Sequence, residues 1–166
     1  MNSNIRTIKK GDVKQTLYIY NYYIENSFSN FEESKISIYK FNLLIKKTLT
    51  NKLPFLVIAI NKKILGLAYL SNYRNKSGYK FAFENSIYIH PEFQGKGLGA
   101  KLLKKLIQIS KTNKKIKNII AIIGDSENIA SIKLHKKTGF NHIGVIKKVG
   151  FKKNKWIDSI IMQKKI

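Results

Sequence analysis

Three closely spaced glycines form the feature of this sequence that is best suited to chemistry. Gly95, Gly97 and Gly99 lie in the run Gln94–Ala100, between an apolar strand-like segment and a strongly periodic helix-like segment. Glycine lets the backbone turn with positive φ, so that the free amide groups of the helix start can converge on one point. With the helix dipole, these amides favour a phosphate or pyrophosphate, and Lys96 adds positive charge. The alternative is a glycine turn that holds no ligand.

Two familiar phosphate-binding motifs fit this loop poorly. A Walker A loop that begins at Gly95 is excluded, because Ala100 and Leu102 stand where that motif requires Gly and Ser or Thr. A dinucleotide fingerprint matches Gly95, Gly97 and Ala100. That fingerprint also needs an acidic residue about 20 residues later, and the segment 111–124 contains none. A third motif, Q/R-x-x-G-x-G/A, therefore becomes the working interpretation.

Glu84 is an acidic residue inside an apolar strand, close to Phe81, Phe83 and Ile87. A carboxylate buried among such side chains has a raised pKa, which suits a base near neutral pH. Attack by an amine on an acyl group needs the neutral amine, so a base must remove a proton from the ammonium. Glu84 is therefore a candidate base. The alternative is a buried structural glutamate that is bonded to backbone or to lysine.

His135 is the histidine most able to act as an acid, because it lies in a predicted helix one turn after Ser131 and can donate or accept a proton near neutral pH. The alternative is a polar helix residue. His90 and His142 are interpreted as structural, and no histidine has the spacing of a zinc site. The chain has no cysteine, which excludes a cysteine acyl carrier and Cys-ligated metal.

The elements that must position these residues follow from hydrophobic periodicity. Helices are predicted at Asp12–Asn26, with Asp12 as the cap, and at Ser37–Thr50, Leu98–Ser110 and Asn128–Thr138. Strands are predicted at Asn4–Lys10, Phe55–Ile60, Ile64–Leu70, Phe81–His90, Asn118–Ile123, Asn141–Val149 and Trp156–Gln163, with a loop over Gly150–Asn154. The order β-α-α-β-β-β-α-β-α-β-β predicts one mixed α/β domain over residues 1–166, with a parallel crossover within 81–123.

Composition limits the class of protein. Hydrophobic residues make up 43% of the 166 residues, which is typical of a globular chain. No apolar run is long enough to span a membrane and no secretion signal is evident, so a cytoplasmic protein is predicted. The net charge of +23 attracts polyanions. However, all the basic residues except Arg6 and Arg74 are lysine, and much of the charge is interpreted as compositional drift.

Two spaced signatures resemble those of the GNAT superfamily of N-acetyltransferases. The first is Q-x-x-G-x-G over Gln94–Gly99, and the second is N-x-A-x-x-x-L-H-x-x-x-G-F over Asn128–Phe140. The resemblance implies the GNAT fold, with about seven strands and about four helices, and acetyl-CoA as co-substrate without a metal. It places the pyrophosphate on the loop amides, the pantetheine along Ile87–Ile89, and Asn128 near the thioester. The implied acetyl-CoA contacts are Ile87, Tyr88, Ile89, Gln94, Gly95, Lys96, Gly97, Leu98, Gly99, Ala100 and Asn128.

A closer resemblance is to the phosphinothricin and methionine sulfoximine N-acetyltransferases. It rests on His135, where most of the superfamily has Tyr, on Glu84 ahead of the Ile87 strand, and on runs such as Gly150-Phe151-Lys152 with Trp156 and Asp158. The resemblance implies a homodimer that acetylates the α-amino group of a small amino acid or analogue. Glu84 would be the base and His135 the acid for the leaving thiolate.

The same resemblance indicates an acceptor pocket. Its implied contacts are Phe31, Arg74 and Tyr79, with Arg74 able to pair with a carboxylate or phosphinate. Lys152 and Trp156 are assigned to a dimer contact or to the pocket, with the core as a further alternative for Trp156. Two other functions stay open: acetylation of a protein N-terminus or ribosomal protein, and non-enzymatic nucleic-acid binding on the same scaffold.

Overall fold

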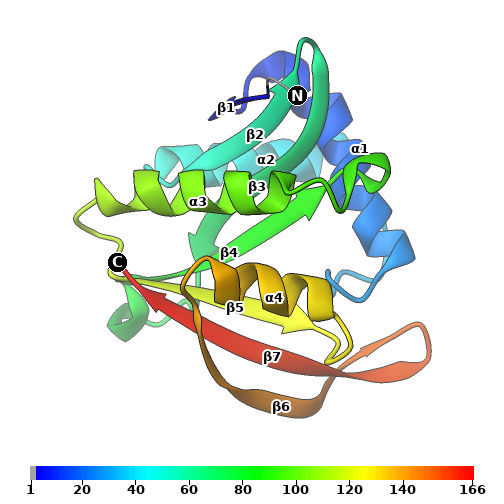
Figure 1. The fold of residues 1–166 in the computed structure, drawn as a ribbon, viewed down its shortest axis with the longest axis vertical. Coiled ribbons are helices and arrows are strands. Elements are labelled where there is room, and N and C mark those ends of the chain that lie inside the picture. The colour runs from blue at the N-terminus through cyan, green and yellow to red at the C-terminus, as the bar shows by residue number, and fades with distance from the viewer. Residues whose placement is uncertain (1–2) are drawn as a thin grey trace.

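The computed structural model describes residues 3–166, and one seven-stranded mixed sheet runs through them in the order β1-β2-β3-β4-β5-β7-β6 (Figure 1). The strands are β1 (Asn4–Thr7), β2 (Phe55–Ile60), β3 (Lys63–Asn72), β4 (Ala82–Ile89), β5 (Asn118–Gly124), β6 (Asn141–Lys152) and β7 (Lys155–Lys165). The helices are α1 (Val13–Asn26), α2 (Ile38–Thr50), α3 (Leu98–Lys111) and α4 (Ile129–Lys137). The predicted element order and the GNAT-type sheet are thus confirmed.

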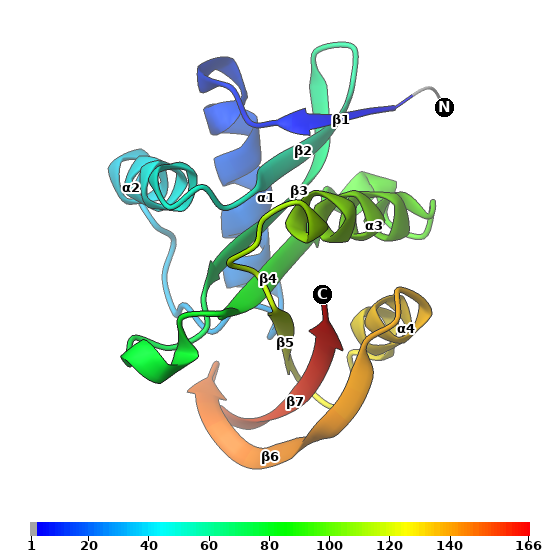
Figure 2. The ribbon, with the colours of Figure 1, turned by 90° about the vertical axis from the view of Figure 1, so that its left-hand side faces the viewer.

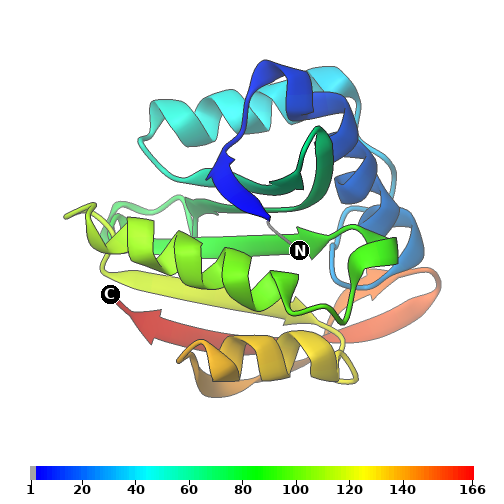
Figure 3. The same ribbon diagram turned by 45° about the horizontal axis from the view of Figure 1, so that its top comes forward.

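The helices form two layers on opposite faces of the sheet. Figure 2 shows α1 and α2 on one side of the sheet and α3 and α4 on the other. Each layer buries its own apolar cluster: Ile19, Ile24 and Phe41 pack with Phe55 on the α1/α2 face. On the opposite face the helical spacing of Leu98, Leu102 and Leu106 places all three leucines in the core. Here α3 and α4 lie beside each other (Figure 3).

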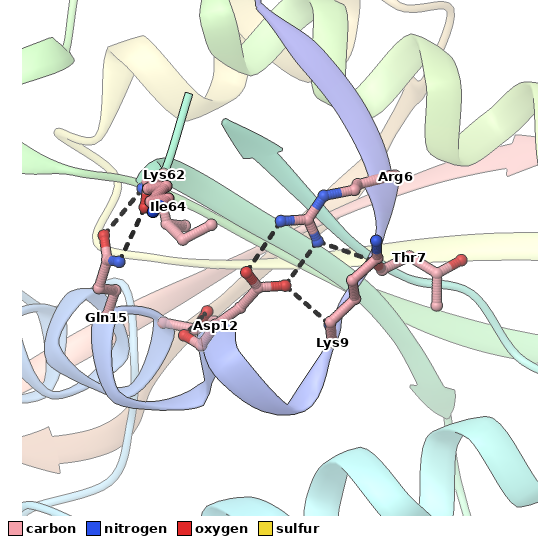
Figure 4. Close-up of polar contacts among 8 residues, drawn as sticks. Arg6, Thr7, Lys9, Asp12, Gln15, Lys62 and Ile64 are labelled. Carbon is pink, nitrogen blue, oxygen red and sulfur yellow. Dashed lines mark hydrogen bonds and ion pairs between the residues drawn. The ribbon is translucent and has the colours of Figure 1, made fainter. Parts of the chain in front are cut away.

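Asp12 begins α1 in a way that differs from the predicted cap. Its side chain makes no hydrogen bond to the first turn of α1. Its carboxylate instead accepts two hydrogen bonds from Arg6, at 2.6 and 2.9 Å, and a third from the Lys9 amide at 2.7 Å (Figure 4). Nearby, the Gln15 side-chain amide donates to the Lys62 carbonyl in the β2–β3 turn, and its oxygen accepts from the Ile64 amide at the start of β3. The start of α1 is therefore fixed to β1 and to the β2–β3 hairpin.

Strands β4 and β5 separate after a short parallel contact. Their pairing covers only Ala82 to Glu84 on β4 and Asn118 to Ile120 on β5. Each strand keeps its other neighbour, because β3 pairs with β4 as far as Ile89 and β7 pairs with β5 as far as Gly124. Figure 1 shows the two strands diverging toward their C-terminal ends. The backbone edges of 85–89 and 121–124 therefore face each other without a ladder between them.

The loop predicted over Gly150–Asn154 is shorter in the structure, where most of it belongs to the β6–β7 hairpin. Gly150 and Phe151 were predicted in a loop, but they belong to β6, which continues to Lys152. The turn consists of Lys153 and Asn154 alone, both with positive φ. A two-residue turn of this kind matches the twist of a hairpin, so the strands can continue to its edge.

Candidate active site

A cavity of about 790 Å³ lies where β4 and β5 separate. Because successive strand residues point to opposite faces, β4 contributes to both sides of it. Glu84, Ser86 and Tyr88 line it on the α1/α2 face, together with the segment between those helices, 29–32. Asn85, Ile87 and Ile89 line it on the α3/α4 face. The cavity therefore connects the two faces of the sheet through the opening between the strands.

The predicted glycine loop forms the wall of the cavity at the start of α3. Gly95 and Gly97 adopt φ values of +72° and +73°, and Gly97 directly precedes the helix. These conformations favour glycine, and they leave the first amides of α3 free for an anion. Gly99 has a different role, because a Cβ there would lie 3.3 Å from the Leu134 side chain. The loop therefore combines an anion cradle with close packing of α3 against α4.

Gln94 is held in place by Tyr23 of α1. The Gln94 side-chain amide donates to the Tyr23 hydroxyl at 2.8 Å, and that hydroxyl donates to the Ile89 carbonyl at 2.6 Å. The resemblance gave no role to Tyr23. The two bonds connect helix α1, the end of β4 and the glycine loop. Lys96 lies with its ammonium 4.8 Å from the Phe93 ring centre.

Asn128 caps helix α4 at the edge of the cavity. Its side-chain oxygen accepts from the Ser131 amide at 3.2 Å, and its amide group donates to the Ser29 hydroxyl at 3.1 Å. An asparagine in this position satisfies one of the free amides of the helix start. Asn128 therefore joins α4 to the segment between α1 and α2.

Glu84 is the last residue of β4 that pairs with β5, and its side chain is only partly exposed. No hydrogen bond or ion pair to its carboxylate occurs within residues 3–166. Burial raises the pKa of Glu84 from 4.5 to about 7, because a charged carboxylate loses its hydration without gaining a partner. The side chain is therefore divided between its acidic and basic forms near neutral pH. The alternative of a structural glutamate bonded to lysine or backbone is not supported.

His135 is buried, with 2% of its surface exposed. Its Nδ1 lies 2.8 Å from the Ser131 carbonyl, and its Nε2 lies 3.0 Å from the Asn85 side-chain nitrogen. These partners assign the proton to Nδ1, with Nε2 accepting from Asn85. Burial lowers the pKa of His135, so the neutral ring is favoured. In this arrangement no ring N–H faces the cavity, which does not support the predicted acid role.

Of the three predicted acceptor contacts, one lines the cavity and two do not. Phe31 lines the cavity, whereas Arg74 and Tyr79 lie outside its lining. The Arg74 guanidinium is 5.3 Å from the centre of the Tyr73 ring and 5.8 Å from that of Tyr79. Tyr73, Arg74 and Tyr79 all belong to the loop between β3 and β4. Within one chain, Arg74 and Tyr79 therefore do not contribute to the cavity lining.

Lys152 and Trp156 also differ from each other, because one is buried and the other is exposed. Trp156 is 63% exposed, which excludes the core alternative for this residue. Lys152 is 2% exposed, and its ammonium donates to the carbonyls of Ser27 and Asn30. Periodicity alone predicts a surface position for a lysine beside a turn, so the sequence offers no signal for this anchoring contact. The lysine holds the segment that lines the cavity near Phe31.

Two further features concern metals and membranes. Among residues 3–166, no three His, Asp or Glu side chains gather as ligands of a metal ion would. No helix in that part of the chain has the length and apolar character needed to cross a membrane.

Comparison with known proteins identifies one family whose members resemble this chain over most of its length. The model of the acetyltransferase (GNAT) domain matches residues 5–161. A phosphinothricin N-acetyltransferase of Alcaligenes faecalis is 37% identical over 96% of this chain and 81% of its own length. An L-methionine sulfoximine/L-methionine sulfone acetyltransferase of Salmonella typhimurium is 38% identical over 66% of this chain and 63% of its own length. A Sinorhizobium meliloti phosphinothricin acetyltransferase, solved in complex with AcCoA, superposes with a TM-score of 0.93 at 31% identity, covering all of this chain and 89% of that one.

Proposed function

Because the chain belongs to the GNAT family of acetyltransferases and is an acetyl-CoA-dependent N-acetyltransferase, we propose that its acceptor is the α-amino group of a small amino acid or analogue. One observation carries the proposal: an unpaired carboxylate, Glu84, faces a cavity at the opening between two strands, and its pKa is about 7. The acceptor class is supported by the relatives, which are described as phosphinothricin or methionine sulfoximine acetyltransferases.

The residues around the opening fit acetyl-CoA, which supplies the acetyl group as a thioester. The free amides and positive-φ glycines of Gln94–Ala100 suit its pyrophosphate. The unpaired edge of β4 at Ile87–Ile89 offers backbone groups to the amide-bearing pantetheine arm. Asn128, at the start of α4, also lines the cavity. The same β4 amides are available to polarise the thioester oxygen.

Glu84 is proposed as the base that accepts a proton from the ammonium of the acceptor. A pKa of about 7 keeps much of the side chain ionised at neutral pH and still basic enough to take the proton. Transfer is direct, because no cysteine is present to carry the acetyl group. Since the neutral His135 presents no ring proton to the cavity, we give it the role of positioning Asn85 on β4 rather than that of the acid.

We also propose a homodimer and a cytoplasmic location. The support for a dimer is the apolar surface of the β6–β7 hairpin, where Ile143, Val149, Phe151 and Trp156 are all more than one-third exposed. Apolar surface of this kind on an edge hairpin is typical of an interface. The use of acetyl-CoA, an intracellular metabolite, supports the cytoplasmic location.

The acceptor is tested by following the release of free thiol from acetyl-CoA with a panel of amines. The panel contains methionine sulfone, methionine sulfoximine, phosphinothricin, unmodified amino acids, spermidine and short peptides with a free N-terminus. Turnover of the amino acids and their analogues, with the other amines inert, is the expected result. Turnover of peptides alone would replace the proposal with protein acetylation. Bound acetyl-CoA without turnover of any panel member would also contradict it.

A further inference from the structure

The Tyr23 hydroxyl lies where the glycine loop meets the free edge of β4. It donates to the Ile89 carbonyl at 2.6 Å and accepts from the Gln94 side-chain amide at 2.8 Å. The ring packs against Tyr88, with 5.1 Å between the two ring centres, and Tyr23 also lines the cavity. Burial raises the pKa of Tyr23, so the hydroxyl keeps its proton and remains a donor. One side chain of α1 therefore joins β4 to the loop.

The Ile89 carbonyl belongs to the edge of β4 that faces away from β3. The amide of His90, in the same peptide group, donates to the Leu65 carbonyl of β3 at 2.8 Å. A trans peptide group directs its N–H and its carbonyl to opposite sides, so the Ile89 carbonyl points to the unpaired edge. Tyr23 therefore occupies the last carbonyl of that edge and marks where the part available to a ligand ends.

The direction of these two bonds fixes the orientation of Gln94. A carbonyl can only accept, so the Tyr23 hydroxyl must give its proton to Ile89 and offer a lone pair to Gln94. The Gln94 side chain therefore presents its NH₂ group, and not its oxygen, to Tyr23. A relay from Gln94 through Tyr23 to Ile89 results, in which each bond polarises and strengthens the other.

The glycine loop has few other restraints. Residues 94–97 are exposed, and a Cβ at Gly95 or Gly97 would meet no atom within 4 Å. The Gln94 backbone amide reaches the Pro91 carbonyl only at 3.5 Å. Within the described part of the chain, the bond to Tyr23 is the one side-chain hydrogen bond that reaches residues 94–97. A loop that is fixed before its ligand arrives loses less conformational entropy on binding, so this bond should contribute to affinity.

We propose that Tyr23 is a positioning residue for acetyl-CoA, which holds the glycine loop in the conformation that receives the pyrophosphate. Its hydroxyl ties Gln94, at the start of the loop, to the last carbonyl on the free edge of β4. The pyrophosphate cradle and the edge offered to the pantetheine arm thereby keep one relative position. The proposal uses the dependence on acetyl-CoA and not the acceptor proposed above, so the outcome of the amine panel does not bear on it.

The test measures the binding of two ligands by isothermal titration calorimetry, which needs no acceptor. CoA carries the pyrophosphate, whereas pantetheine has the same thiol-bearing arm without the pyrophosphate and the nucleotide. Tyr23→Phe removes only the hydroxyl. Tyr22→Phe is the matched control, because its ring lies 5.5 Å from that of Tyr23 but its hydroxyl makes no hydrogen bond within residues 3–166. Gln94→Met keeps the length of the other side chain and cannot donate.

Tyr23→Phe is expected to raise the Kd of CoA about tenfold, the effect of losing one to two hydrogen bonds. The Kd of pantetheine, and both values for Tyr22→Phe, should change less than about twofold. In a Gln94→Met background, Tyr23→Phe should raise the Kd of CoA by less than about threefold, because its bond to the loop is already absent.

Equal rises in the Kd of CoA and of pantetheine would overturn the proposal and make Tyr23 a support of the cavity as a whole. An unchanged Kd of CoA, or a full effect of Tyr23→Phe in the Gln94→Met protein, would overturn it as well. Gln94 is exposed, so Gln94→Met alone repeats the comparison of the two ligands without disturbing the core. It must show the same selective loss of CoA binding.

Discussion

At the scale of single residues, the chemistry of this site comes from a polar group that the fold leaves unpaired. Glu84 has no counter-ion among the described residues, although it lines a cavity in a chain of net charge +23. His135 and Asn128 are the opposite case, since their polar atoms are engaged within the protein. A residue of the first kind is suited to react, and those of the second kind are suited to hold the site in shape.

The raised pKa of Glu84 implies a cost to stability that depends on pH. The folded-state pKa of about 7 lies above the ordinary glutamate value of 4.5. Stability is therefore greatest when the carboxyl is protonated, and it is lost as pH rises from about 4.5 through 7. Glu84→Gln should be more stable than the unmodified protein at pH 8, by about 2–3 kcal/mol at most, and nearly equal to it at pH 4. Denaturant unfolding at both pH values measures the difference, and an equal change at pH 4 and pH 8 would contradict it.

At the scale of elements, three structures must meet to form the cavity. The separation of β4 from β5 opens it, the start of α3 supplies its anion cradle, and the segment between α1 and α2 lines it on the α1/α2 face of the sheet. That segment has no regular structure of its own. It depends on Lys152, on Asn128 and on Gly150, where a Cβ would collide with the Phe31 ring.

Lys152→Met should loosen the segment between α1 and α2 without disturbing the acetyl-CoA side. A methionine can fill the space but cannot donate to the carbonyls of Ser27 and Asn30. The KM for the acceptor is expected to rise about tenfold, from loss of one to two hydrogen bonds at the anchor. The KM for acetyl-CoA should stay within about twofold, and hydrogen exchange at Ser29 to Phe31 should become faster. Lys155→Met is the matched control on the exposed side of the same turn. Equal rises in both KM values would contradict this role.

The pairing of Arg6 with Asp12 should make the N-terminal elements sensitive to acid. The Arg6 guanidinium and the Lys9 amide lower the pKa of Asp12, which is 8% exposed. The stabilising contribution is therefore present above the unfolded-state pKa near 4 and is lost as pH falls below it. Asp12→Asn should lower the free energy of unfolding at pH 7 by about 1–3 kcal/mol. The difference from the unmodified protein should shrink toward pH 3, and a difference independent of pH would contradict this explanation.

At the scale of the whole molecule, two features extend beyond the site. The excess of lysine gives a positive field that attracts an anionic co-substrate such as acetyl-CoA. The β6–β7 hairpin forms one edge of the sheet and carries exposed apolar side chains along it. The segment that lines the cavity near Phe31 is anchored to this hairpin through Lys152, so an interface there would lie close to the cavity.

The dimer is expected to depend on this hairpin. Ile143 and Trp156 are 56% and 63% exposed, and replacing both with glutamate should yield a species of single-chain mass. Sedimentation velocity of the unmodified protein should give twice that mass. Ile38→Glu, on the exposed side of α2, is a control that should leave the dimer intact. A dimer that survives the double change, or an unmodified protein that is monomeric, would contradict the proposal.

The sequence predicts the element order because its helices and strands have clear periodicity and because the glycine loop needs a strand before it and a helix after it. It does not predict where β4 and β5 separate. That point depends on the pairing of β4 with β3 and of β5 with β7, which are long-range contacts. The sequence also does not predict that Arg74, placed in the acceptor pocket by resemblance alone, lies outside the cavity lining. Nor does it predict the position of Lys152, whose burial depends on carbonyls more than 120 residues away. Long-range contacts of this kind leave no local pattern in the chain.

The most direct measurement is the pH dependence of kcat for Glu84→Gln, with saturating acetyl-CoA and methionine sulfone. The unmodified protein should lose activity about tenfold per pH unit below pH 7, as Glu84 becomes protonated. Glu84→Gln should lower kcat by about 100-fold or more and abolish that dependence, with the KM for acetyl-CoA unchanged within about twofold. Glu33→Gln, outside the cavity lining, should behave like the unmodified protein. A Glu84→Gln variant that keeps most of its kcat, or that keeps the same loss below pH 7, would contradict the role of Glu84 as the base.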